Sequence, residues 1–98
     1  MPTSNLIAVA TFCESHHIDI SFVQLLDQTG LVETTIIEKD IFISEEQLPS
    51  LERMVRLHFD MDINIEGIET ISYLLERITR MQQEIRQLKN TIGLYQHP

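Results

Sequence analysis

A seven-residue repeat over the last third of the chain constrains its fold more than any other feature. Isoleucine recurs every seven residues at four positions from Ile71, and a second apolar residue follows each isoleucine three positions later, the last being Tyr95. This a/d pattern is typical of a coiled-coil seam, and the flanking residues are mostly polar. The repeat predicts one long helix from Ile65 to Tyr95, about 46 Å long at ~1.5 Å rise per residue.

Such a helix is too long to fold back entirely on a domain made from a chain of 98 residues. Its far half would expose apolar side chains unless another chain covered them, so the repeat predicts a homodimer. Isoleucine at a, with mixed Leu, Met and Tyr at d, favours a parallel dimer. Arg77 and Glu84 share the g position and would instead pair across an antiparallel dimer, so both orientations stay open. The predicted dimer interface comprises Ile71, Leu74, Ile78, Met81, Ile85, Leu88 and Ile92.

The first 30 residues predict two short helices. Apolar residues are spaced for one helix over Asn5–His17 and for a second over Asp19–Thr29. Asp19 or Ser21 can cap the second helix, and Gly30 can end it because glycine accepts the left-handed backbone of a helix C-terminus. Two short helices joined by a tight link indicate a helix-turn-helix.

Residues 31–44, LVETTIIEKDIFIS, predict a β-hairpin. Two runs rich in β-branched residues flank the polar segment Glu38–Asp40. A helix follows: Ser44–Gln47 has the form of a capping box, whereas Pro49 suits the first position of a helix. Either start places a helix directly after the hairpin.

Residues 60–67, DMDINIEG, alternate acidic and apolar side chains and resemble a calcium loop. The best register starts at Asp62, but its twelfth position is Tyr73, where such a loop needs a bidentate carboxylate. The segment is therefore predicted to join two helices, one ending near Asp60 and the next capped by Asn64. The predicted fold is mainly α: a winged helix-turn-helix region over residues 1–63 and a long C-terminal dimerisation helix over 64–98, in one structural domain.

Charge is distributed unevenly along the chain. Residues 1–52 hold nine acids and one base, whereas residues 53–98 hold six of each, so the net charge of −8 lies in the N-terminal half. Proteins bind duplex DNA largely by neutralising phosphates with Lys and Arg, so this half should repel DNA and attract a basic protein surface. The predicted partner-binding residues are Asp19, Gln24, Asp27, Gln28, Glu33, Glu38 and Asp40.

The sequence lacks the residue patterns of an enzyme. Cys13 is the single cysteine and is predicted to be a small buried residue, while the three glycines are too far apart to form a phosphate loop. We therefore expect no catalytic residues, no metal and no cofactor. No apolar run approaches the ~20 residues of a membrane span, and no basic segment precedes the first apolar stretch, so we expect a cytoplasmic protein.

The order of these elements resembles the MerR-type winged-helix proteins. ISFVQLLDQTGLV (residues 20–32) is similar to their recognition helix, and DINIEGIETISYLL (62–75) is similar to the entry of their dimerisation helix. Unlike the DNA readers of that family, the first segment contains no Lys or Arg. A narrower resemblance is to the CbpM family of chaperone modulators, a MerR-like offshoot. TFCESHHI (11–18), RMVRLHFDMDINIEGI (53–68), MQQEIRQLKNTI (81–92) and LYQHP (94–98) carry it.

The CbpM resemblance implies a partner, the J-domain of a DnaJ-like co-chaperone. Members of that family inhibit the co-chaperone's stimulation of a DnaK-type chaperone and its DNA binding. J-domains present a basic helix to that chaperone, and an acidic N-terminal half would complement such a surface. The broader resemblance implies an alternative, a MerR-type transcriptional regulator that binds DNA as a dimer.

Overall fold

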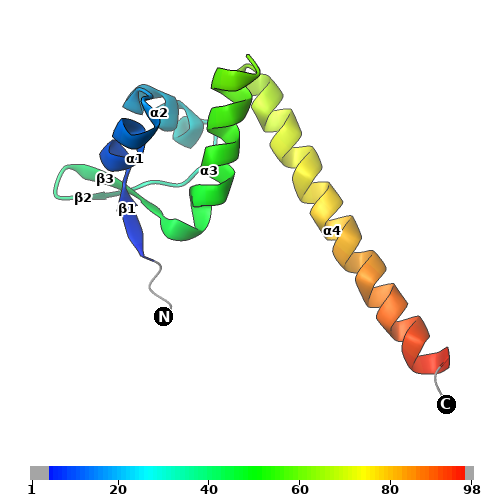
Figure 1. Cartoon of the computed structure of the whole chain (residues 1–98). Helices are drawn as coiled ribbons and strands as arrows, with labels where there is room; N and C mark the ends of the chain where they lie inside the picture. Colours follow the sequence, from blue (N-terminus) through cyan, green and yellow to red (C-terminus); the bar gives the residue numbers. More distant parts are fainter. Residues whose placement is uncertain (1–4, 97–98) are drawn as a thin grey trace. The chain divides into compact units, whose positions relative to one another are not determined.

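A computed structural model of the protein describes residues 5–96, with side chains for residues 5–93. The chain divides into two compact units, residues 1–65 and 66–98. The first contains short helices and a small sheet, and the second is helical (Figure 1). The fold is mainly α, as the sequence predicts.

The sheet has three antiparallel strands in the order β1-β3-β2. β3 (Asp40–Ser44) lies in the centre, between β1 (Leu6–Ala8) and β2 (Thr35–Ile37). On one side Ile7 of β1 pairs with Ile43, which is fully buried. The sheet therefore ties the start of the chain to the hairpin.

β1 corrects the prediction of a helix over Asn5–His17. The helix α1 spans only Val9–His16, and the residues before it are extended. Their backbone groups pair with β3, and Glu45 N donates a 2.8 Å hydrogen bond to Asn5 O just beyond the strand. Pairing with a strand more than 30 residues away outweighs a local helical pattern, since strand formation depends on its tertiary neighbours.

The helix-turn-helix prediction is confirmed. The left-handed residue His17, with φ of 56°, follows the last residue of α1, and Ile18 N donates to Cys13 O at 3.0 Å. α2 (Ile20–Gln28) then begins, and the Asp19 carboxylate caps it by accepting a 2.9 Å bond from Ser21 N. This tight link fixes the start of α2.

The end of α2 and the hairpin both rely on left-handed residues. Gly30, with φ of 82°, follows α2 as predicted. In the hairpin, β2 and β3 are joined by Glu38 and Lys39, whose φ values are 49° and 74°. Two left-handed residues in a two-residue turn match the twist of the strands. The left-handed backbone conformation costs more free energy in a residue with a Cβ atom than in glycine.

The segment after the hairpin starts with a 3-10 turn, η1 (Glu45–Gln47), and continues as α3 (Leu48–Val55) with Pro49 in its first turn. The capping-box alternative is wrong, because the Ser44 side chain makes no cap bond. The Gln47 side chain is used instead to hold the loop before β2: its Oε1 accepts from Glu33 N at 2.8 Å, and its Nε2 donates to Glu33 O at 2.9 Å.

α3 continues into a π-helical segment, η2 (Arg56–Asp60), and a joint containing the left-handed residue Asp62. A helical break near Asp60 is therefore confirmed. The core of the first unit gathers apolar side chains from β3, from α1, α2 and α3, and from the loop that follows α2. It comprises Val9, Phe12, Cys13, Phe22, Val23, Leu26, Val32, Ile43, Leu51, Met54 and Val55.

The second unit is formed by α4, which spans Ile65–Gln96 as one uninterrupted helix. The predicted start is confirmed, and the predicted end differs by one residue. Its threonines return hydrogen bonds to carbonyls four residues earlier, as Thr79 Oγ1 does to Leu75 O at 3.0 Å. The side chains of Leu94 and Tyr95 lie outside the described residues, so the last position of the repeat stays a prediction.

Candidate protein-binding surface

Two grooves of the first unit share residues of α2. Gln24 and Gln28, one helical turn apart, line both grooves. They are exposed, as expected for residues on the outer face of a helix whose inner face holds Phe22, Val23 and Leu26 in the core. The outer face of α2 is therefore the centre of the candidate surface.

The first groove has a volume of about 610 Å³ and is lined by residues of α2, of η2 and of the link before α2. Phe22, His58 and Phe59 form an aromatic cluster within it. The Phe22 and His58 rings stack with centroids 4.9 Å apart, and Phe59 meets both rings edge-on at 5.1 and 4.8 Å. Such edge-on and stacked pairs are favourable arrangements for aromatic rings.

The His58 ring is fixed by a second contact. Its Nδ1 lies 2.9 Å from Ile63 O, and because a carbonyl only accepts, Nδ1 carries the proton. The ring therefore has a structural packing role within the aromatic cluster. The hydrogen bond also links the groove to the joint that follows η2.

The second groove is smaller, at about 310 Å³, and lies between α2 and the hairpin. Ile36 and Ile41 line its hairpin side, and Ile36 is the most exposed large apolar residue of the described chain, at 70%. Asp27 lines the opposite side and accepts a 2.8 Å hydrogen bond from Thr34 Oγ1. The hairpin is thereby tied to the outer face of α2.

The structure brings some of the predicted partner-binding residues together and separates others. Asp19, Gln24 and Gln28 line the first groove, and Asp27 joins the two glutamines in the second. Glu38 and Asp40 line neither groove and lie at the hairpin turn. All seven predicted residues are exposed: Asp19, Gln24, Asp27, Gln28, Glu33, Glu38 and Asp40.

Sequence reasoning missed the aromatic side of the first groove. Phe22 and Phe59 are 37 positions apart, and only the fold brings them together. The only local signal was Phe59, a large apolar residue that follows His58 at the end of an amphipathic helix and lies off its core-facing side. Such a residue is expected to pack against a different element.

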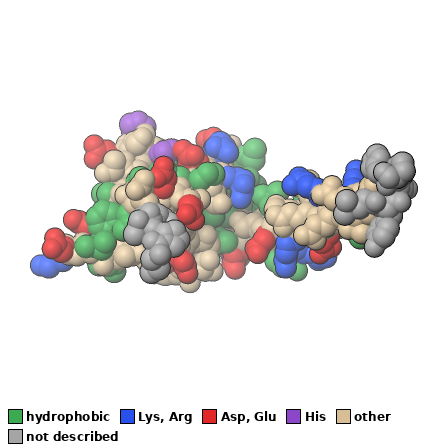
Figure 2. Space-filling model, turned by 90° about the horizontal axis from the view of Figure 1, so that it is seen from below, with side chains coloured by type: hydrophobic (Ala, Val, Ile, Leu, Met, Phe, Trp, Pro, Cys, Tyr) green, Lys and Arg blue, Asp and Glu red, His purple; other side chains and the backbone are tan. Residues whose placement is uncertain are grey.

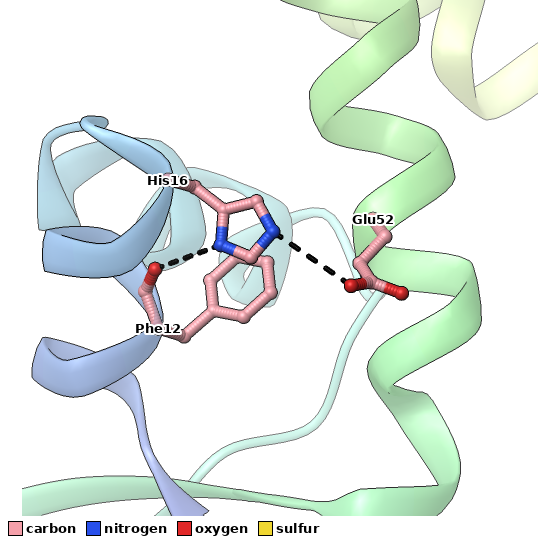
Figure 3. A network of polar contacts seen from close by, with 3 residues as sticks. All are labelled: Phe12, His16 and Glu52. Carbon is pink, nitrogen blue, oxygen red and sulfur yellow. Dashed lines mark hydrogen bonds and ion pairs between the residues drawn. The ribbon is translucent and has the colours of Figure 1, made fainter.

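A separate polar contact joins α1 to α3 (Figure 3). The His16 ring stacks on Phe12 with centroids 4.1 Å apart, its Nδ1 lies 3.0 Å from Phe12 O, and its Nε2 lies 3.7 Å from a carboxylate oxygen of Glu52. Nδ1 donates to the carbonyl, and Nε2 faces the Glu52 carboxylate on α3. These residues line neither groove, and we assign them to holding the two helices together.

The whole net charge lies in the first unit. Residues 1–65 contain eleven acids and three bases, a difference of −8, whereas residues 66–98 contain four of each and are neutral overall. Figure 2 shows acidic side chains on the visible face of the first unit. A unit with this charge opposes the phosphate contacts that position a protein on duplex DNA.

The candidate surface contains one carboxylate whose pKa is lowered by its hydrogen bonds. Hydrogen bonds from Ser21, first from its backbone N–H and then from its hydroxyl, hold the pKa of Asp19 below its usual value, so this acid stays ionised. Cys13 lies behind the surface, where burial, and secondarily the charge of Asp19, raise the pKa of its thiol. Its predicted buried position is confirmed.

The predicted dimer residues lie on α4, and six of them, from Leu74 to Ile92, are exposed by 49–62%. Ile71 is partly exposed. These exposures show an apolar stripe along the helix. Within residues 5–96 no helix has the length and apolar character to cross a membrane. The described side chains also contain no cluster of three or more metal-ligating residues.

The chain was compared with known proteins. The model of the "MerR HTH family regulatory protein" family matches residues 7–90. Two similar relatives are named "Chaperone modulatory protein CbpM", from Pseudomonas entomophila (strain L48) and Pseudomonas putida (strain W619). Each is 24% identical over 86 residues, which cover 87% of this chain and 85% of the relative. No solved structure gives a significant match.

The family match and the fold agree. The family model covers both the helix-turn-helix with its hairpin and most of the long helix. The broader and the narrower resemblance inferred from the sequence are therefore both supported, the first by the family model and the second by the two relatives. The chain belongs to the MerR HTH regulatory proteins and, within them, is similar to the CbpM chaperone modulators.

Proposed function

We propose that the protein is a non-enzymatic modulator that binds the J-domain of a DnaJ-like co-chaperone and limits its stimulation of a DnaK-type chaperone. The observation that carries this proposal is the combination of a MerR-like fold with a net charge of −8 confined to residues 1–65. The name of the similar Pseudomonas proteins supports modulation of a chaperone system. The basic helix of a J-domain supplies the opposite charge.

Charge and apolar contact would have different tasks in this complex. Complementary charge mainly raises the association rate and selects the partner, whereas buried apolar contacts supply most of the affinity. The outer face of α2 offers both, since its exposed polar residues line grooves together with the half-exposed Leu25 and Phe59 and the more exposed Ile36.

We further propose that the active form is a homodimer assembled through α4. The apolar stripe of the helix repeats at the coiled-coil period and is about half-exposed in one chain. A second copy carries the same stripe and covers it by symmetry. Each dimer would then present two acidic units to its partners.

The proposal is tested by titrating the full chain with a purified J-domain from the same cell in a calorimeter. We expect saturable binding that weakens as salt rises from about 50 to 300 mM, because screening shortens the reach of surface charges. A chaperone ATPase assay with the complete co-chaperone should show less stimulation when the protein is added. Absence of binding to every J-domain protein of that cell would contradict the proposal.

The family match favours one alternative, a transcriptional regulator that binds duplex DNA. Such a regulator would shift duplex DNA at low salt, with an affinity that falls steeply as salt rises. We expect no shift, because the first unit has three bases against eleven acids. Tight binding to an oligonucleotide near physiological ionic strength would restore the regulator interpretation.

A further inference from the structure

The first groove combines an apolar interior with an accessible wall. Leu25 on α2 and Phe59 on η2 both line it, and they remain 41% and 49% exposed. Phe59 is held in place by its edge-on contacts with Phe22 and His58. Two large apolar side chains that line one concave surface mark an interaction site more strongly than isolated ones.

The rim of the groove carries a fixed negative charge. Among the described residues that line it, Asp19 is the one formally charged side chain at neutral pH when histidine is neutral. Ser21 N anchors its carboxylate at 2.9 Å. The remaining rim is polar, with Gln24 and Gln28 further along α2. This arrangement suits an apolar group that has a cation beside it.

The length of the groove fits a helix. Its lining residues on and next to α2 run from Asp19 to Gln28, nine residue steps, or about 14 Å of helix. Amphipathic helices bind such grooves through apolar side chains spaced by three or four residues. A small ligand would need burial of most of its surface, whereas this groove has exposed side chains along its wall.

We propose that the first groove binds a basic amphipathic helix of the partner protein, with its apolar side chains on Leu25 and Phe59 and a Lys or Arg beside Asp19. This inference rests on the proposed function and assigns one of the two grooves to it. The second groove and the hairpin then lie outside the central contact.

The apolar part is tested by calorimetric titration of a J-domain into Leu25→Ala and Phe59→Ala variants of the full chain. Truncating central apolar contacts should raise Kd at least about tenfold. Ile36→Ala is the matched control, because it removes an exposed apolar side chain from the second groove, and it should change Kd less than about twofold. Circular dichroism melting of each variant confirms that it is folded.

The charged part is tested with Asp19→Asn. Asparagine is also a good N-cap, so α2 keeps its start while the charge is lost. Association with the J-domain should slow a few-fold at low salt, and its rate should depend less on salt. Asp40→Asn, on the hairpin, removes the same charge from an exposed position outside both grooves and should have a smaller effect.

The outcomes separate the two proposals. If the unaltered chain binds the J-domain and only Ile36→Ala weakens binding, the groove assignment is wrong and the proposed function stands. If Leu25→Ala and Phe59→Ala change the oligomeric state and leave J-domain affinity unchanged, the groove contacts a second copy and the assignment is again overturned. If the unaltered chain does not bind, both proposals fail.

Discussion

The substitution Ile85→Ala tests the proposed dimer most directly. Ile85 lies at an a position of α4 and is 51% exposed in one chain. Complete burial of an isoleucine side chain stabilises by about 1.5–3 kcal/mol, so covering the exposed half stabilises by about 0.8–1.5 kcal/mol. A twofold-symmetric dimer buries two copies of Ile85, so this stabilisation is doubled. Alanine keeps one methyl group, so we expect a loss of about 1–2 kcal/mol per dimer, or a Kd raised roughly 5- to 30-fold.

Sedimentation equilibrium over a range of protein concentrations measures this Kd. Gln83→Ala is the control, because it occupies the f position of the preceding heptad, away from the seam, and should leave Kd unchanged. The reasoning is refuted if the unaltered chain remains monomeric up to ~100 μM, a concentration at which micromolar affinity would give mostly dimer. It is also refuted if both variants shift Kd equally.

Four further measurements test the first unit. Leu26→Ala should lower the free energy of unfolding in urea by about 2–5 kcal/mol, because this side chain is fully buried. Lys39→Gly should raise it by about 0.5–1 kcal/mol, because glycine relieves the left-handed turn. Iodoacetamide at pH 8 should modify Cys13 far more slowly in the native chain than in urea, because burial raises the pKa of the thiol and restricts access. The lowered pKa of Asp19 stabilises the chain above the ordinary value of 3.8, and this is lost as pH falls. The native chain should therefore lose stability relative to Asp19→Asn below about pH 4 in urea titrations.

Elements with a strong local signal could be predicted from the sequence. α2 has a capping acid before it and a left-handed glycine after it, so both ends are marked by single residues. α4 carries its period over four heptads, and its start was predicted correctly. The hairpin was found from two β-branched runs, although its turn contains neither glycine nor asparagine.

Elements that depend on distant partners were missed. The three residues of β1 are apolar and continue into the pattern of α1, so only pairing with β3 distinguishes them as a strand. The first groove is also a tertiary feature, since η2 supplies His58 and Phe59 to a surface built on α2. The sequence identified the polar rim of this surface through Asp19, Gln24 and Gln28, and it gave no means of pairing that rim with its aromatic interior.

The placement of all net charge in residues 1–65, with none in residues 66–98, gives ionic strength a selective effect. Contacts between apolar side chains of a heptad seam respond little to dissolved ions. The attraction between an acidic surface and a basic protein is screened by salt over a Debye length of ~10 Å at 0.1 M. If the proposed complex forms, a rise in cellular salt, as during osmotic stress, would release the co-chaperone while the proposed dimer stays intact. That dimer could then bind the co-chaperone again without reassembly.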